Sequence, residues 1–360
     1  MEIANFFDIP ISTIKDKVCV DKNIITDLEL IEKNNEDKNI LSYIFNPSNS
    51  FAEITQNMWC KYQTTDIKHL KESQNLYKAF KITDVKDNDY LNSIYDNYTS
   101  YKVDTGFKEK YGFMDWSHLE FLNHMEYFLL IFAVIHILSP IFSLIIPILF
   151  LIFPYILLII QGNPITIDVY MGVIANMFRN TSMGKLITGD FTDFRQASYF
   201  IMTIVMYGFQ IYSNILTCIR FHYHLTKLHT FMLEMTDYIT YTTKNIDIYI
   251  NYIRDLDTYQ NFKITLETHN QTLKNYLYKI NKIPAYSWNV TELLNLGYVQ
   301  KNFYNIYDDE KLHNSLMYSF GFHGYIDNIM GIQNNIKAKK MNYCSYNKKK
   351  NTKFVKAFFC

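Results

Sequence analysis

The sequence predicts a mainly α-helical protein: a helical core with a long helical arm and an inserted transmembrane helical hairpin. Three observations favour this fold class. Gly and Pro number only 11 and 7 among the 360 residues, about 5% against an average of about 12%, so turns that need them are few. Residues 127–160 contain no Asp, Glu, Lys or Arg. Residues 209–283 contain neither Gly nor Pro.

Residues 1–115 are interpreted as the N-terminal portion of the helical core. Polar turns interrupt this region, and Asn46-Pro47-Ser48 followed by Phe51 is typical of a loop that leads into a helix. The region contains 14 basic and 19 acidic residues. We therefore expect several short helices separated by polar turns.

Residues 116–220 are predicted to form a membrane-embedded segment, because they contain only nine charged residues. The charge-free run 127–160 exceeds the roughly 20 helical residues that cross a bilayer. Since proline removes a backbone donor, the sequence predicts a break at Ser139-Pro140 and a helical hairpin over residues 121–160. One long, kinked and tilted helix is the alternative, because membrane helices tolerate proline.

A second apolar helix is expected at residues 197–219, which carry no charge but include several polar side chains. This stretch is either a second span or a core or interfacial helix. If both ends of the chain belong to one core, the number of crossings is even. Either the hairpin at 121–160 spans and 197–219 does not, or each apolar stretch crosses once. Flanking positive charges are too evenly distributed to set the orientation.

Residues 221–284 are predicted to form the long helical lever or arm. Its apolar positions recur at spacings of three and four, as in a coiled coil: Leu225, Leu228, Met232, Met235 and Ile239. Helices of an ordinary bundle would give the same pattern. Residues 285–336 would then return to the core as shorter helical pieces, separated at Gly297, Gly321, Gly324 and Gly331.

Residues 337–360 form a basic segment with eight Lys and no acidic residue. Its candidate contacts for nucleic-acid phosphates or anionic lipid are Lys348, Lys349, Lys350, Lys353 and Lys356. A solvated segment without a partner has the same composition. Tyr and Phe residues interleave with these lysines, so stacking on bases and packing in a folded segment are both compatible with the sequence.

The sequence contains no motif for catalysis or for a resident cofactor. The nearest string to a phosphate-binding loop, Met183-Gly184-Lys185-Leu186, lacks the upstream glycine and the hydroxyl residue. The cluster of Cys218, His222, His224 and His229 is better explained by ordinary helix positions than by zinc. The five cysteines are scattered and odd in number, which favours a reducing compartment. We expect no catalytic residue, no metal and no cofactor in this chain.

Several short strings resemble the MutS-like DNA mismatch repair proteins of giant-virus type. They include the run from Phe45-Asn46-Pro47 to Gln74, the proline-spaced insert followed by Gln161-Gly162, the string Tyr318–Ile326, and Lys353–Phe358. Asp27–Leu30 is similar to the entry into the core domain of that family. The resemblance covers most of the chain, although each string is short.

The resemblance implies the core and lever region of such a protein, with the ATPase domain missing. ATP and Mg²⁺ would then act only on that missing domain, and this chain would be non-catalytic. Expected partners are a membrane of a host or virion, DNA, and either a second copy in a homodimer or a partner ATPase domain. Both termini would lie on the cytosolic side. The alternative function is that of an integral membrane structural protein of a virion or organelle with no nucleic-acid role.

Overall fold

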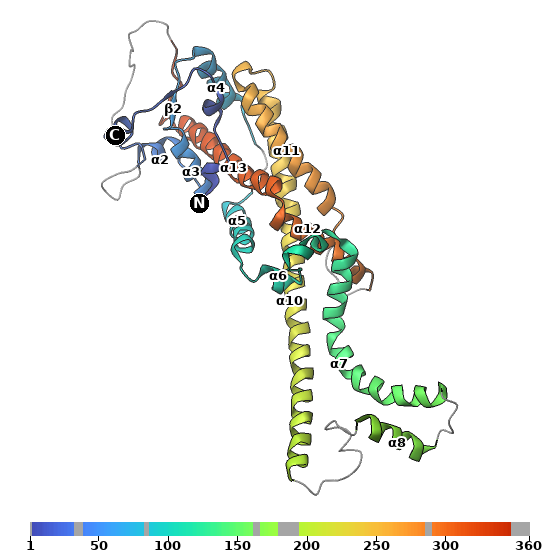
Figure 1. Ribbon diagram of the computed structural model, residues 1–360. Helices are drawn as coiled ribbons and strands as arrows, with labels where there is room; N and C mark the ends of the chain where they lie inside the picture. Colours follow the sequence, from blue (N-terminus) through green and yellow to red (C-terminus); the bar gives the residue numbers. More distant parts are fainter. Residues whose placement is uncertain are drawn as a thin grey trace. The chain divides into compact units, whose positions relative to one another are not determined.

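The computed structural model describes residues 2–31, 39–82, 86–160, 166–178, 194–284 and 290–346, and most of them are helical (Figure 1). This confirms the mainly α-helical prediction. The only sheet in these ranges is a two-stranded antiparallel ribbon of β1 (Val18–Cys19) and β2 (Tyr62–Gln63).

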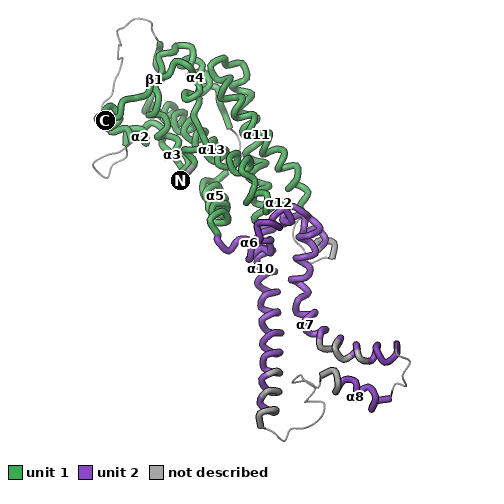
Figure 2. The backbone as a smooth tube through the Cα atoms, viewed as in Figure 1, with its two compact units in different colours: residues 1–104, 231–284, 302–360 green, residues 105–230, 285–301 purple. Residues whose placement is uncertain are grey.

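Two compact units make up the fold (Figure 2). Unit 1 contains residues 1–104, 231–284 and 302–360, and unit 2 contains residues 105–230 and 285–301. The predicted membrane-embedded segment 116–220 therefore falls within unit 2. Unit 1 combines segments that precede and follow this insert in the sequence.

Short helices separated by polar turns form the N-terminal part of unit 1, as predicted. Asn49 caps α3 by accepting a hydrogen bond from the backbone N–H of Ala52 at 2.8 Å, and Asp66 caps α4 by accepting one from Lys68 at 2.9 Å. The elements are η1 (Glu2–Asn5), η2 (Pro10–Thr13), α1 (Lys22–Asp27), α2 (Ile40–Phe45), α3 (Ser50–Met58), α4 (Ile67–Ala79) and α5 (Asn88–Val103).

Long helices complete unit 1: the C-terminal part of α10 (Phe194–Ile253), η4 (Asp257–Tyr259), α11 (Gln260–Ile280) and α13 (Glu310–Lys337). The apolar stripe of α10 contributes to the core here, since Met232, Met235 and Ile239 are fully buried. Polar contacts fix the register between α10 and α13. Tyr238 bonds to Ser319 at 2.7 Å between hydroxyl oxygens.

The predicted division of residues 285–336 at glycines is wrong. Helix α12 (Val290–Asp308) continues through Gly297, and α13 continues through Gly324 and Gly331. In α13 the glycines permit close packing: a Cβ at Gly331 would lie 1.5 Å from the carbonyl oxygen of Phe45, and one at Gly324 would lie 2.4 Å from that of Phe51. The backbones of α2 and α3 therefore approach α13 more closely than any side chain would allow.

Unit 2 contains α6 (Phe107–Tyr111), η3 (Ser117–His124), α7 (Glu126–Ile160), α8 (Ile167–Phe178), the N-terminal part of α10 and the start of α12. The predicted hairpin break at Ser139-Pro140 is wrong, because α7 passes through both residues without ending. The helix bends along its length but does not reverse there (Figure 1). The structure thus has the long, kinked helix that was the alternative.

Candidate membrane-binding surface

Side-chain hydroxyls allow α7 to continue through Pro140 and Pro147. Pro140 has no N–H, so the carbonyl of His136 loses its helical partner; the Ser139 hydroxyl donates to that carbonyl at 2.9 Å. Pro147 similarly frees the carbonyl of Ser143, which accepts a hydrogen bond from the Tyr207 hydroxyl of α10 at 2.8 Å. Both carbonyls are satisfied without water, as a helix in lipid requires.

Helices α7 and α10 form an antiparallel pair within unit 2. Besides the Tyr207 bond, the rings of His136 and Phe221 stack with centroids 5.0 Å apart, and the Cys218 thiol donates to the carbonyl of Ile137 at 3.3 Å. Positions on α10 fall as positions on α7 rise, which is the signature of antiparallel helices. The pair brings the two apolar stretches of the sequence together.

One end of this helix pair is packed against protein. Ala133, Phe221, Leu225 and Leu296 form a buried cluster. A Cβ at Gly297 of α12 would lie 2.2 Å from the carbonyl oxygen of Glu126, so α12 crosses closely over the start of α7. This protein-covered end fixes where the helix pair begins.

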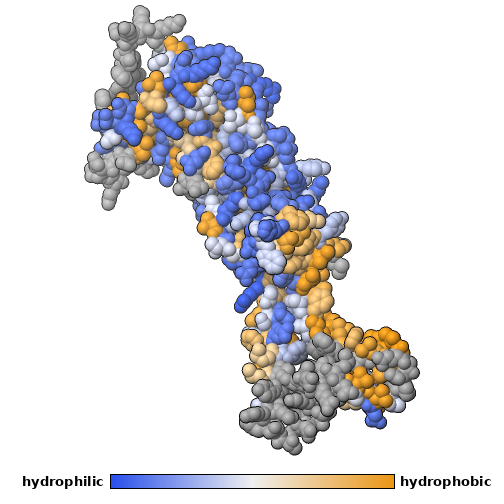
Figure 3. Space-filling model, viewed as in Figure 1, coloured by the Kyte–Doolittle hydropathy of each residue, from blue (hydrophilic) through white to orange (hydrophobic). Residues whose placement is uncertain are grey.

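Beyond that end, the outward side chains of the pair are large, apolar and exposed. Figure 3 shows hydrophobic side chains gathered over α7 and α8. Ile131 of α7 is 60% exposed and Phe209 of α10 is 64% exposed. The other exposed apolar side chains of the two helices include Ile135, Ile141, Phe142, Leu144, Ile145, Ile146, Ile201, Met202, Ile204, Val205, Met206 and Ile215. Such contiguous apolar surface is rare on proteins surrounded by water alone.

Helix α8 extends this surface by packing against the C-terminal part of α7. The rings of Tyr155 and Tyr170 meet edge to face with centroids 6.2 Å apart, while Leu158 and Ile174 are each 2% exposed. The chain therefore returns to α7 only after Ile160, and not at Ser139-Pro140. Exposed Ile159, Ile160 and Ile167 continue the apolar surface there.

The length criterion for a membrane span is met by one helix in the described part of the chain. The qualifying stretch is Glu126–Ile146, with 21 residues and 17% of its apolar window buried. The predicted second apolar helix, 197–219, belongs to α10 from residue 197 onward. It contributes exposed apolar side chains to the same surface.

Other predicted site residues are placed as follows. Ser139 and Pro140 are half-buried within α7. Lys348, Lys349, Lys350, Lys353 and Lys356 lie outside the described residues. Across the described ranges no group of three or more His, Cys, Asp or Glu is arranged to hold a metal ion. The Cys218 thiol instead bonds to the backbone of α7.

Sequence reasoning missed Tyr207 as a functional residue of the helix pair. Two features of the sequence pointed to such a bond: Tyr207 carries a hydroxyl in the charge-free stretch 197–219, and Pro147 leaves a carbonyl without a helical donor in the charge-free stretch 127–160. Nothing in the sequence pairs these two residues, because 64 positions separate Tyr207 from Ser143.

Comparisons with known proteins found no match: no protein-family model, no curated protein and no solved structure is similar to this chain.

Proposed function

We propose that this chain is a membrane-attached helical scaffold. In this proposal, α7 and the N-terminal part of α10 enter the lipid, and unit 1 remains in the aqueous phase. One observation carries it: the outward face of α7 between residues 127 and 146 is apolar, uncharged and exposed, while its inner face packs on α10. Transfer of such side chains from water to lipid is favourable by about 25 cal/mol per Å².

The satisfied carbonyls of α7 support lipid and not water as the surroundings of this face. In water, the carbonyls freed by Pro140 and Pro147 would find solvent donors. In lipid each unpaired carbonyl would cost several kcal/mol. The bonds from Ser139 and Tyr207 supply these donors from the protein itself.

The chain segments that make up unit 1 support an even number of membrane crossings. Residues 1–104 and 231–284 pack together in this unit, so the chain that leaves it before α7 returns to it through α10. One pass by each helix satisfies this condition, as one of the two predicted arrangements requires. We propose that unit 1, with both termini, faces the cytosol, where the free cysteines would stay reduced.

Flotation of the full chain tests membrane attachment. The chain is synthesised in a cell-free system with liposomes and centrifuged through a sucrose gradient. We expect it to float with the lipid and to resist extraction at alkaline pH. A chain that stays at the bottom of the gradient, monomeric and folded, would overturn the proposal.

Two exposed cysteines of unit 1 test the topology. Cys19 and Cys344 lie toward opposite ends of the chain and are both exposed. A membrane-impermeant maleimide applied to sealed vesicles should modify both or neither. Modification of only one would mean an odd number of crossings and would contradict the arrangement of unit 1.

The role predicted from the MutS-like resemblance is a finer proposal. It has the scaffold couple an ATPase domain to DNA or to the membrane, with Lys348, Lys349 and Lys350 near the phosphates. Filter binding of duplex DNA that weakens with salt and is lost on substitution of these three lysines by Glu would support it. No binding even at low salt would favour the alternative, a membrane structural protein without a nucleic-acid role.

A further inference from the structure

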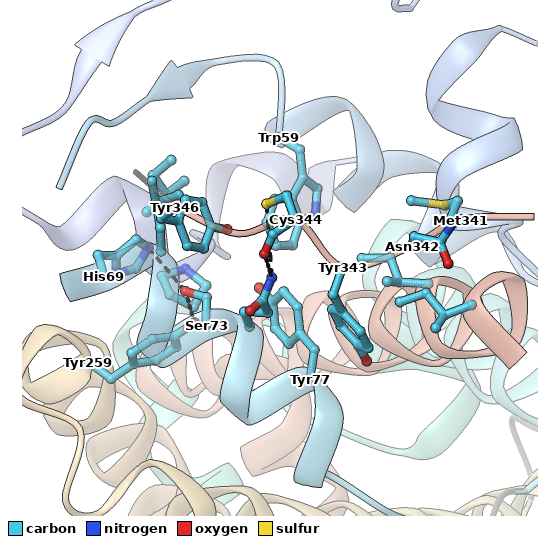
Figure 4. Close-up of a pocket in the computed structure, with 16 residues that line it drawn as sticks. Trp59, His69, Ser73, Tyr77, Tyr259, Met341, Asn342, Tyr343, Cys344 and Tyr346 are labelled. Carbon is cyan, nitrogen blue, oxygen red and sulfur yellow. Dashed lines mark hydrogen bonds between the residues drawn. The ribbon is translucent and has the colours of Figure 1, made fainter. Parts of the chain in front are cut away.

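Unit 1 contains a cavity of about 250 Å³ that the proposed membrane role does not use. Figure 4 shows it between α4 and the C-terminal part of α13, beneath the extended residues 341–346, which we call the strap. All of its lining residues belong to unit 1. It is therefore separate from the apolar surface of α7, α8 and α10.

The walls of the cavity suit a neutral, flat molecule. Its aromatic lining residues are Trp59, Tyr77, Tyr259, Tyr343 and Tyr346. Among the described residues, no Asp, Glu, Lys or Arg lines it. Burial raises the pKa of Tyr259 to about 12 and holds the pKa of Tyr77 well above its ordinary value, so these phenols are uncharged at neutral pH. A charged ligand would find no partner here and would lose its hydration.

His69 is a polar residue of the cavity wall, and its hydrogen bonds determine which ring nitrogen carries the proton. Glu72 accepts hydrogen bonds from the backbone N–H of Thr258 at 3.1 Å and from its hydroxyl at 2.7 Å. The single hydroxyl proton of Thr258 is thereby used. His69 Nδ1, 3.0 Å from that hydroxyl oxygen, must donate its own proton to it.

His69 Nε2 is consequently an acceptor. Burial lowers the pKa of His69, which keeps the ring neutral with its proton on Nδ1. Nε2 lies 3.5 Å from the Ser73 hydroxyl oxygen, whose shorter contact is with the Tyr259 hydroxyl at 2.8 Å. A ligand that donates a better hydrogen bond to Nε2 would improve on this long contact.

We propose that this cavity binds a neutral, flat aromatic molecule carrying one hydrogen-bond donor, with the rings of its walls around the ligand and His69 Nε2 accepting the donor. The strap covers the bound molecule. It is held by the Gln74 side-chain amide, which donates to the carbonyl of Cys344 at 2.8 Å, and by Lys78 Nζ, 4.3 Å from the centroid of the Tyr343 ring. These contacts are exposed and few, so opening the strap for entry costs little.

Fluorinated indoles provide the test, because they are flat and their N–H is the single donor. The full chain in nanodiscs is titrated with 5-fluoro-3-methylindole and with 5-fluoro-1-methylindole, and binding is followed by fluorine NMR. The two probes have the same size, but only the first keeps the N–H. We expect saturable binding of the first and roughly three- to tenfold weaker binding of the second, the effect of one lost hydrogen bond.

Two variants separate the cavity from partitioning into lipid. Leu70→Trp fills the cavity from a half-buried position of α4 and should abolish saturable binding of both probes. His69→Phe keeps a ring of similar size and removes the acceptor, so the two probes should bind it equally. Circular dichroism of each variant verifies folding, and if His69→Phe does not fold, Leu70→Trp with the two probes still decides the outcome. Wild-type signals that match those of Leu70→Trp, or equal affinity of both probes for the wild type, would overturn the proposal.

Discussion

Ile131 of unit 2 and Ile264 of unit 1 are each 60% exposed, yet their surroundings differ. Ile264 lies in α11 between Lys263 and Thr265, with Glu267 one turn away. Ile131 lies in α7, where the next charged residue on the C-terminal side comes after residue 160. Single exposed isoleucines are ordinary on water-facing surfaces. The continuity of the apolar surface, and not the exposure of one side chain, is therefore what distinguishes the candidate membrane-binding surface.

Lysine substitutions at these exposed positions should have the largest effect, a loss of liposome binding that is specific to α7. Ile131→Lys combined with Leu144→Lys places two charges at exposed apolar positions of α7, each of which would cost about 2.5–3.5 kcal/mol at the centre of a bilayer. We expect the double variant to lose most of its flotation with liposomes. The matched control Ile264→Lys, at equal exposure in unit 1, should float like the wild type. Equal flotation of all three would show that α7 does not enter lipid.

Glycine-to-alanine substitutions should also have very different effects on stability in the two units. A Cβ at Gly331 in α13 meets the carbonyl oxygen of Phe45 at 1.5 Å, whereas one at Gly208 in α10 meets nothing within 4 Å. We therefore expect Gly331→Ala to destabilise unit 1 by about 3 kcal/mol or more, since backbone must move. Gly208→Ala should be neutral or stabilise α10 by up to about 1 kcal/mol. Urea unfolding followed by circular dichroism measures both, and a neutral Gly331→Ala would contradict the packing of α13 on α2.

These glycines also show what the sequence could and could not predict. Composition and periodicity were enough for the helical class, for the long helices after residue 209 and for the apolar stretch of α7, because these depend on local patterns. A glycine that ends a helix and one that admits a neighbouring backbone look the same in sequence. The difference at Gly324 and Gly331 is decided by α3 and α2, which lie far away along the chain.

The candidate site, too, was predictable only in part from the sequence. The apolar face of α7 was predicted from composition, but the break at Ser139-Pro140 was not correct. Whether a proline ends a helix depends on whether another donor bonds to the carbonyl that the proline leaves without a partner. In α7 the hydroxyls of Ser139 and Tyr207 are these donors. The cavity beneath the strap was not predicted at all. Its lining includes residues of α4, α13, η4 and the strap, and no periodicity brings these segments together.

Acid should destabilise unit 1 through a buried histidine. Burial lowers the pKa of His323 to about 3, while its ring stacks on Tyr241 and its Nε2 contacts the Thr242 hydroxyl at 2.8 Å. Because the unfolded chain binds a proton near pH 6.5, this group's contribution is complete above pH 6.5 and is lost as pH falls toward 3. The slope approaches 1.4 kcal/mol per pH unit, or roughly 3 kcal/mol over two units.

A variant pair isolates this pH dependence. His323→Gln removes the titrating group and should flatten the loss of stability between pH 6 and pH 4, measured by urea unfolding at each pH. His118→Gln, at an exposed position of η3 in unit 2, serves as the control and should leave the wild-type slope unchanged. An unchanged slope in His323→Gln would show that the acid sensitivity of unit 1 arises elsewhere.

The smallest effect is expected from removing a single hydroxyl within the pair of helices α7 and α10. Tyr207→Phe leaves the carbonyl of Ser143 without its donor, which should weaken the packing of α10 on α7 by about 1 kcal/mol. Tyr212→Phe is the matched control, because Tyr212 is 58% exposed on the same helix.

Maleimide labelling of Cys218 measures the opening of the pair, since its thiol bonds to the backbone of α7. In nanodiscs, with the other cysteines replaced by alanine, Tyr207→Phe should label roughly fivefold faster than the wild type. Tyr212→Phe should label at the wild-type rate. If both variants labelled alike, the hydroxyl of Tyr207 would not be needed to satisfy the carbonyl that Pro147 frees, and α7 would have to tolerate its proline by another donor.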